Sequence, residues 1–172
     1  RMPFYQFGEM NELGPIPTEK WIPFLQERFR SNGQTLPEEY AIEICSFVEN
    51  HSSYVQQLAW NVMVETDKEV DGGSFRRGCV TLLAQCNNYF IEQTRGLSSY
   101  QMNFLRLLCN GVDRNFGNSK VQSAFPLGSK SNISRIKTAP VAKELIEEMS
   151  DGTVRLCDAV FGRWFRHTFG VL

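Results

Sequence analysis

The sequence lacks any long apolar run. No window of about 20 uncharged apolar residues occurs in its 172 residues, so no segment is predicted to span a membrane. Histidine is scarce, since only His51 and His167 occur, and the five cysteines form no Cys-x-x-Cys pair. Zinc ligands cluster at short spacings, so no metal site is predicted. The odd number of scattered cysteines on apolar helix faces favours a reducing compartment, and we expect a cytoplasmic protein.

A phosphate-binding loop is also missing from the sequence. No Gly-x-x-x-x-Gly-Lys-Ser/Thr pattern occurs, and no apolar strand ends in paired acidic residues. The stretch Gly128-Ser-Lys-Ser has the residues in the wrong order, and Ser123 stands in the place of the first glycine. We therefore predict that this chain is not an enzyme and that it has no catalytic residue.

Two pairs of reactive side chains could suggest catalysis, and neither fits an active site. Cys157 and His167 could act as nucleophile and base, but they fall at a predicted strand end and among aromatic residues, where structural roles explain them. Glu147 and Glu148 are adjacent in a predicted strand, so their side chains point to opposite faces and cannot converge on one substrate.

Charge is distributed unevenly along the chain, although the net charge is only −1. Residues 1–96 carry eight Lys or Arg against thirteen Asp or Glu, whereas residues 97–172 carry ten against six. This asymmetry is expected if only the second half contacts a polyanion such as nucleic acid. Ordinary variation in surface charge is the alternative.

Residues 1–17 are predicted to be a strand and a linker. Residues 1–8 resemble a lone strand, and a strand cannot satisfy its own backbone hydrogen bonds, so we expect its partners in a missing upstream domain. The chain also begins with Arg1 instead of methionine, which suggests a piece of a longer protein.

Residues 18–96 are predicted to form a four-helix bundle. Apolar residues recur at helical spacing after Thr18, Pro37, Ser53 and Ser74, each of which suits a helix start. The expected core positions are Trp21, Phe24, Leu25, Phe29, Ala41, Ile44, Cys45, Val48, Val55, Leu58, Ala59, Val62, Met63, Phe75, Cys79, Leu82, Leu83, Cys86 and Phe90.

Residues 97–172 are predicted to form a winged helix-turn-helix domain. A capping box at Ser98 begins its first helix, a helix-turn-helix follows, and residues 145–157 read as a β-hairpin that turns at Asp151-Gly152. Three helices followed by a hairpin make a winged helix. The predicted fold class is therefore mainly α, with a small helical bundle followed by a winged helix-turn-helix domain with a hairpin wing.

The helix-turn-helix is predicted over residues 118–137. Its short first helix would bury Val121, Ala124 and Phe125, which fall at i, i+3 and i+4. The turn follows at Pro126-Leu-Gly, and Ser129 is expected to cap the second helix. Because proline cannot continue the backbone hydrogen bonding, we expect a kink or an end near Thr138–Ala139, just before Pro140.

The outward face of the second helix is the candidate nucleic-acid site. Cations and short polar side chains on a helix suit a duplex groove and its phosphates. The expected phosphate contacts are Lys120, Lys130, Lys137 and Arg155, and the expected base contacts are Asn132, Ser134 and Arg135. A solvated surface helix without a ligand is the alternative.

Three stretches of the sequence together resemble the C-terminal part of a bacterial P-loop ATPase of the archaeal-type family, which is related to the AAA+ and STAND ATPases. They are RMPFYQFG with IPTEKWIPFL, NHSSYVQQL, and LSSYQ through DAVFGRWF. The first is similar to the exit from a nucleotide domain into its helical lid, the second to a lid turn, and the third to a winged-helix domain. Ser52-Ser53 departs from the usual Gly/Pro character of the lid turn, and Ala159 replaces a frequent proline.

The resemblance implies a lid that senses nucleotide, with Tyr54 and Gln57 near the nucleotide, although ordinary helix surface explains both. It implies ATP and Mg²⁺ for the full-length parent and no cofactor for this piece. The leading hypothesis is a lid fused to a winged helix that binds double-stranded DNA. The alternative is a regulatory module that packs on its own ATPase domain or on another protein.

Overall fold

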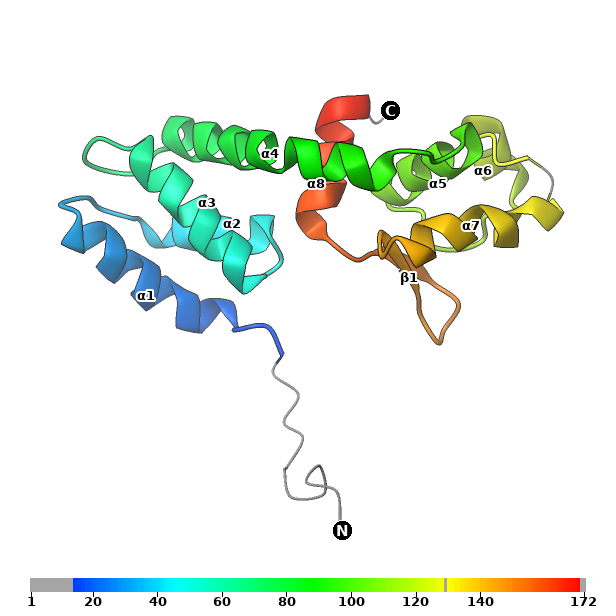
Figure 1. The fold of residues 1–172 in the computed structure, drawn as a ribbon. Helices are drawn as coiled ribbons and strands as arrows, with labels where there is room; N and C mark the ends of the chain where they lie inside the picture. Colours follow the sequence, from blue (N-terminus) through cyan, green and yellow to red (C-terminus); the bar gives the residue numbers. More distant parts are fainter. Residues whose placement is uncertain (1–13, 129, 171–172) are drawn as a thin grey trace, which may run out of the picture.

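The computed structural model describes residues 14–128 and 130–170 and is mainly helical, as predicted (Figure 1). The predicted strand at residues 1–8 and the predicted cap Ser129 lie outside the described residues. The elements, in chain order, are α1 (Thr18–Ser31), α2 (Glu38–Phe47), α3 (Ser52–Val64), α4 (Gly72–Thr94), α5 (Ser99–Cys109), α6 (Ser119–Ala124), the 3₁₀ helix η2 (Lys130–Asn132), α7 (Ile133–Ala142), β1 (Ile146–Glu148), β2 (Val154–Leu156) and α8 (Ala159–Phe169).

Helices α1 to α4 bury the apolar faces that the helical spacing predicted. Leu25 and Phe29 of α1 and Ile44 of α2 are among the buried side chains. The prediction for Phe24 was wrong, because 41% of this side chain is exposed. Trp21, Leu25 and Phe29 already fill the inner stripe of α1, and Phe24 lies beside that stripe instead of within it.

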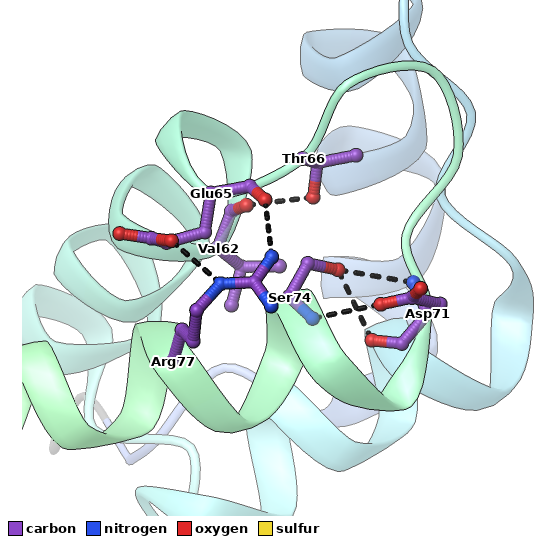
Figure 2. Close-up of polar contacts among 6 residues, drawn as sticks. All are labelled: Val62, Glu65, Thr66, Asp71, Ser74 and Arg77. Atoms are coloured by element: carbon purple, nitrogen blue, oxygen red, sulfur yellow. Dashed lines mark hydrogen bonds and ion pairs between the residues drawn. The ribbon is translucent and has the colours of Figure 1, made fainter.

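Helix α4 begins three residues earlier than predicted, with Asp71 as the N-cap in place of Ser74. The Asp71 carboxylate accepts a hydrogen bond from the Ser74 backbone N–H at 2.7 Å, and the Ser74 hydroxyl accepts one from the Asp71 N–H at 3.0 Å (Figure 2). This capping box stabilises a first turn that contains Gly72 and Gly73. Two glycines are poor helix formers, which is why helical spacing alone missed this turn.

The α3–α4 junction is held by Arg77 as well. Its guanidinium donates to the Glu65 carboxylate at 2.7 Å and to the Glu65 carbonyl at 2.9 Å, while the Thr66 hydroxyl donates to the Val62 carbonyl (Figure 2). Gly78 lies at the closest approach of the two helices, where an added Cβ would stand 2.9 Å from the Val62 backbone nitrogen. The sequence from Glu65 to Gly78 therefore fixes how α4 packs on α3.

Several local signals in the second half are confirmed. Ser98 and Gln101 form the predicted capping box of α5. Strands β1 and β2 pair antiparallel in the register Ile146↔Leu156, Glu147↔Arg155 and Glu148↔Val154. Asp158 caps α8 by accepting hydrogen bonds from the N–H groups of Val160 and Phe161 at 2.7 and 3.0 Å. Three helices followed by a β-hairpin are thus present in the predicted order.

Two predictions about the helix-turn-helix differ in part from the structure. No residue of helix α6 is fully buried: Ala124 is exposed, whereas Val121 and the following Phe125 are half-buried and pack against the core. Phe116 and Leu127, on either side of α6, enter the core instead. Helix α7 does not end before Pro140 but continues to Ala142, and Pro140 is buried with its carbonyl accepting a hydrogen bond from the Leu145 N–H at 2.9 Å. The alternative expectation of a kink at this proline stays a prediction.

Helix α8 connects the first four helices to the rest of the chain and crosses the C-terminal half of α4 in Figure 1. Phe90 of α4 lies 5.3 Å from both Phe161 and Trp164, measured between ring centroids, and the Trp164 indole N–H donates to Asn87 at 3.0 Å. The buried residues form a continuous core from α1 to α8. The division of the chain into domains at residue 97 stays a prediction.

Candidate nucleic-acid interface

Helix α7 is held against α5 by one face. Ile136 and Pro140 are buried on that face, and Ser134 and Arg135 are exposed on the other. The exposure of Ser134 and Arg135 agrees with their predicted outward positions, whereas Lys137, which was also predicted to face outward, has only 16% of its side chain exposed. The outward face of α7 is therefore available for a ligand.

The turn before α7 has its own fixed geometry. Gly128 has φ +80°, a backbone conformation that favours glycine, and the Asn132 amide donates to the Leu127 carbonyl at 3.1 Å. The Asn103 side chain of α5 donates to the Pro126 carbonyl at 3.0 Å. Asn132, predicted to contact base edges, thus already has one of its amide protons bonded within the turn.

One predicted phosphate contact, Lys120, and one predicted base contact, Arg135, are exposed. Lys120 lies in the first turn of α6, where the Asn118 side chain accepts a hydrogen bond from its backbone N–H at 2.9 Å, and its side chain is exposed. Arg135 is exposed and has no ion pair with another described residue. Lys130 belongs to η2, but its side chain lies outside the described residues.

The predicted phosphate contacts Lys137 and Arg155 are both paired with carboxylates of the hairpin. Lys137 forms an ion pair with Glu148, and only 16% of the lysine side chain is exposed. Arg155 forms an ion pair with Glu147, its cross-strand neighbour, and this carboxylate raises the pKa of the guanidinium. The hairpin therefore presents two neutralised pairs beside α7, and its net attraction for a polyanion is small.

Tyr100 was missed by the sequence reasoning, although it lies beside the same surface. Together with Gly128, Ser131, Asn132 and Arg135 it lines a shallow hollow of about 310 Å³ at the start of α7. Its ring is exposed, and no periodicity marks it because it precedes the apolar stripe of α5. An exposed aromatic ring beside a cation suits an unpaired base or a sugar, which stack on such rings.

Tyr54 and Gln57, predicted to lie near a nucleotide, make contacts inside the described structure. The Tyr54 hydroxyl donates to the Asp158 carboxylate at 2.9 Å, and the Gln57 amide donates to Gln85 at 2.9 Å. Burial, with the Asp158 charge, raises the pKa of Tyr54 far above its ordinary value, so this phenol stays protonated. Their proximity to a nucleotide stays a prediction.

Neither a candidate metal site nor a helix that could span a membrane occurs among the described residues. Within them, no three His, Cys, Asp or Glu side chains are grouped so that they could hold a metal ion. No helix in this part of the chain has the length and apolar character needed to cross a bilayer.

Comparison with known proteins adds a fold likeness. No family model matches the sequence, and no curated protein matches it. Among solved structures, the chain is similar to the Walker-type ATPase PABY2304 of Pyrococcus abyssi, with a TM-score of 0.66 and 17% sequence identity. The match covers 88% of this chain and 42% of that chain, so this chain corresponds to less than half of the ATPase.

Proposed function

We propose that this chain is the non-catalytic C-terminal region of a P-loop ATPase and that helix α7 binds double-stranded nucleic acid. The fold likeness to part of a Walker-type ATPase supports the first half of the proposal. The sequence contains no phosphate-binding loop, so ATP and Mg²⁺ belong to the upstream domain of the parent. The chain itself is expected to hydrolyse no ATP.

The observation that supports nucleic-acid binding is the outward face of α7. Ser134 and Arg135 are exposed on the side opposite the buried Ile136, with Lys120 exposed on the neighbouring helix α6. A helix held on a three-helix support, with polar and cationic side chains outward, can enter the major groove. Arg135 is the residue best suited to a bidentate contact with guanine.

The ion pairs of the hairpin limit the number of phosphates that the protein can neutralise. With Lys137 and Arg155 paired to carboxylates, roughly two or three cations remain for phosphate contacts. The logarithm of the affinity should then fall with the logarithm of salt concentration with a slope of about −2 to −3. A steeper slope would mean that the Lys137–Glu148 and Arg155–Glu147 ion pairs break when nucleic acid binds.

The test is fluorescence anisotropy of a labelled DNA duplex at several salt concentrations, with the whole chain as titrant. Arg135→Ala is expected to weaken binding by at least about fivefold. Arg30→Ala is the matched control, because Arg30 is an exposed arginine of α1 that pairs with Glu27 on the same helix. Equal affinity of the Arg135→Ala variant and the wild type, or no salt-dependent binding at all, would contradict the proposal.

A second candidate function is regulation of the parent ATPase, and the contacts of α8 favour it. The Arg163 guanidinium donates to the Phe47 carbonyl at 2.6 Å and stacks on the Phe47 ring at 4.2 Å. Together with the Tyr54–Asp158 hydrogen bond, it connects α2 and α3 to α8. A movement of the first helices by an adjoining nucleotide domain would therefore be transmitted to the second half of the chain.

The two functions are distinguished in the full-length parent. Deleting residues 97–172 changes the ATPase rate or the oligomeric state if this region regulates the parent. Arg163→Ala, which removes the contacts to α2 without deleting any element, should change the same property in the same direction. Unchanged rates in both variants would rule out regulation through α8.

A further inference from the structure

A groove between α1 and α3 has no role in the proposed nucleic-acid site. It measures about 420 Å³ and is lined on one side by Phe24 and Arg28 and on the other by Gln56, Trp60 and Met63. These helices lie at the opposite end of the molecule from α7 (Figure 1). The groove is therefore separate from the proposed nucleic-acid surface on α7.

Two aromatic side chains that line the groove are exposed, unlike the other tryptophans of the protein. Trp60 is 63% exposed and Phe24 is 41% exposed, whereas Trp21 and Trp164 are 5% and 1% exposed. Val64, 65% exposed, follows Trp60 by four residues and extends the same apolar strip along α3. Neighbouring apolar side chains exposed in this way mark interaction surfaces.

The described lining of the groove carries one charged side chain. Among the described residues that line the groove, Arg28 is the only one with an ionisable side chain, and none of them carries a carboxylate. Its guanidinium lies 5.1 Å from the centroid of the Phe24 ring, and it has no ion pair with another described residue. The adjacent carboxylate of Glu27 is already paired with Arg30. Because Arg28 has no ion pair with another described residue, a carboxylate on the molecule that occupies the groove would complement its charge.

We propose that this groove binds an acidic amphipathic helix of a partner protein. A third helix fits between two helices by placing its apolar ridge in their groove, with its anchors on Trp60 and Met63. A carboxylate on the edge of the incoming helix pairs with Arg28. A single cation is too little to hold a nucleic acid, and a basic surface, which an anionic membrane requires, is absent from the lining residues.

The probe is a synthetic helical peptide with Leu at every third or fourth position and Glu along both edges, compared with a twin that carries Lys in place of Glu. Trp60 provides the readout, because the other two tryptophans are buried. Binding of the Glu peptide should shift the fluorescence of the whole chain to the blue and protect it from acrylamide. The Lys twin should bind at least tenfold more weakly.

Charge reversal makes the test sharper, with binding followed by the anisotropy of the labelled peptides. Arg28→Glu should invert the preference, so that the Lys twin binds better than the Glu peptide. Trp60→Ala should weaken both peptides, whereas Tyr89→Ala, which removes an equally exposed aromatic ring from α4, should change neither.

Four results would overturn the proposal. The first is equal binding of the two peptides to the wild type, and the second is an unchanged preference in Arg28→Glu. The third is self-association of the chain that depends on Trp60, because a second copy would then occupy the groove. Displacement of the Glu peptide by duplex DNA would also assign the groove to a different ligand.

Discussion

Gly78 is a position where a single methyl group decides the packing of two helices. An added Cβ would stand 2.6 Å from the Val62 Cγ2 and 2.9 Å from the Val62 backbone nitrogen, and the backbone cannot move aside cheaply. Gly78→Ala should lower the free energy of unfolding by about 1–2 kcal/mol, although alanine itself favours the helix by nearly 1 kcal/mol. Urea denaturation measures the change.

The matched control for that substitution lies in the same helix. At Gly72 an added Cβ would meet only the Tyr40 hydroxyl, at an ordinary 3.5 Å. Gly72→Ala should leave the stability unchanged or raise it slightly. Equal losses in the two variants would show that the close approach of α3 at Gly78 does not determine the result, because helix propensity favours alanine at both positions.

Asp158 serves two elements with one carboxylate. It caps α8 and also accepts the hydrogen bond of the half-buried Tyr54 hydroxyl. Asp158→Ala should lower the free energy of unfolding by about 2 kcal/mol, since it removes the cap and leaves the phenol without its partner. Asp158→Asn keeps a capping oxygen and should cost less, and thermal unfolding of the three proteins would rank them.

At the scale of the elements, the hairpin determines how many cations face a polyanion. Glu147→Gln together with Glu148→Gln should release Arg155 and Lys137 from their ion pairs. If the proposed nucleic-acid interface is correct, duplex DNA should bind more tightly, and the salt slope should steepen by about one to two units. The measurement is the same anisotropy titration that tests Arg135.

Net charge alone would also favour DNA in that variant, so a control must change the charge elsewhere. Glu27→Gln removes a carboxylate that pairs with Arg30 on α1, at the other end of the molecule. It should leave the salt slope unchanged. An equal increase in affinity in this control would show that the effect is not local to the hairpin.

At the scale of the whole molecule, buried thiols make stability depend on alkaline pH. Burial raises the pKa of Cys45 and of Cys109 from 9.0 to about 11. In the unfolded chain these thiols ionise near pH 9.0. Their contribution to the free energy of unfolding is therefore fully present below that pH and is lost as the pH rises towards 11. In this pH range each thiol can lower the free energy of unfolding by up to about 1.4 kcal/mol per pH unit.

The measurement is urea denaturation between about pH 7 and pH 11 with a reducing agent present. Cys109→Ala should lower the stability at neutral pH, because it leaves a small cavity, and should also make the alkaline decline shallower. Cys157→Ala, at an exposed position, should keep most of the decline. A flat profile in the wild type would contradict the role of the buried thiols.

The sequence by itself determined the local features of this protein. The capping box at Ser98, the Asp151-Gly152 turn and the Asp158 cap each depend on residues within a few positions, and the apolar spacing fixed most of the core of α1 to α5. Helix caps and tight turns can be predicted from the sequence because the residues that form them are only a few positions apart in the chain.

Tertiary structure alone decided which charged and polar side chains remain available. Lys137 meets Glu148 only because α7 continues through the buried Pro140 and brings the lysine beside the hairpin. Tyr54 and its partner Asp158 are 104 residues apart. Trp60 of α3 and Phe24 of α1 line the same groove. None of these outcomes follows from spacing, because each depends on the relative placement of helices that only the packing of the whole core fixes.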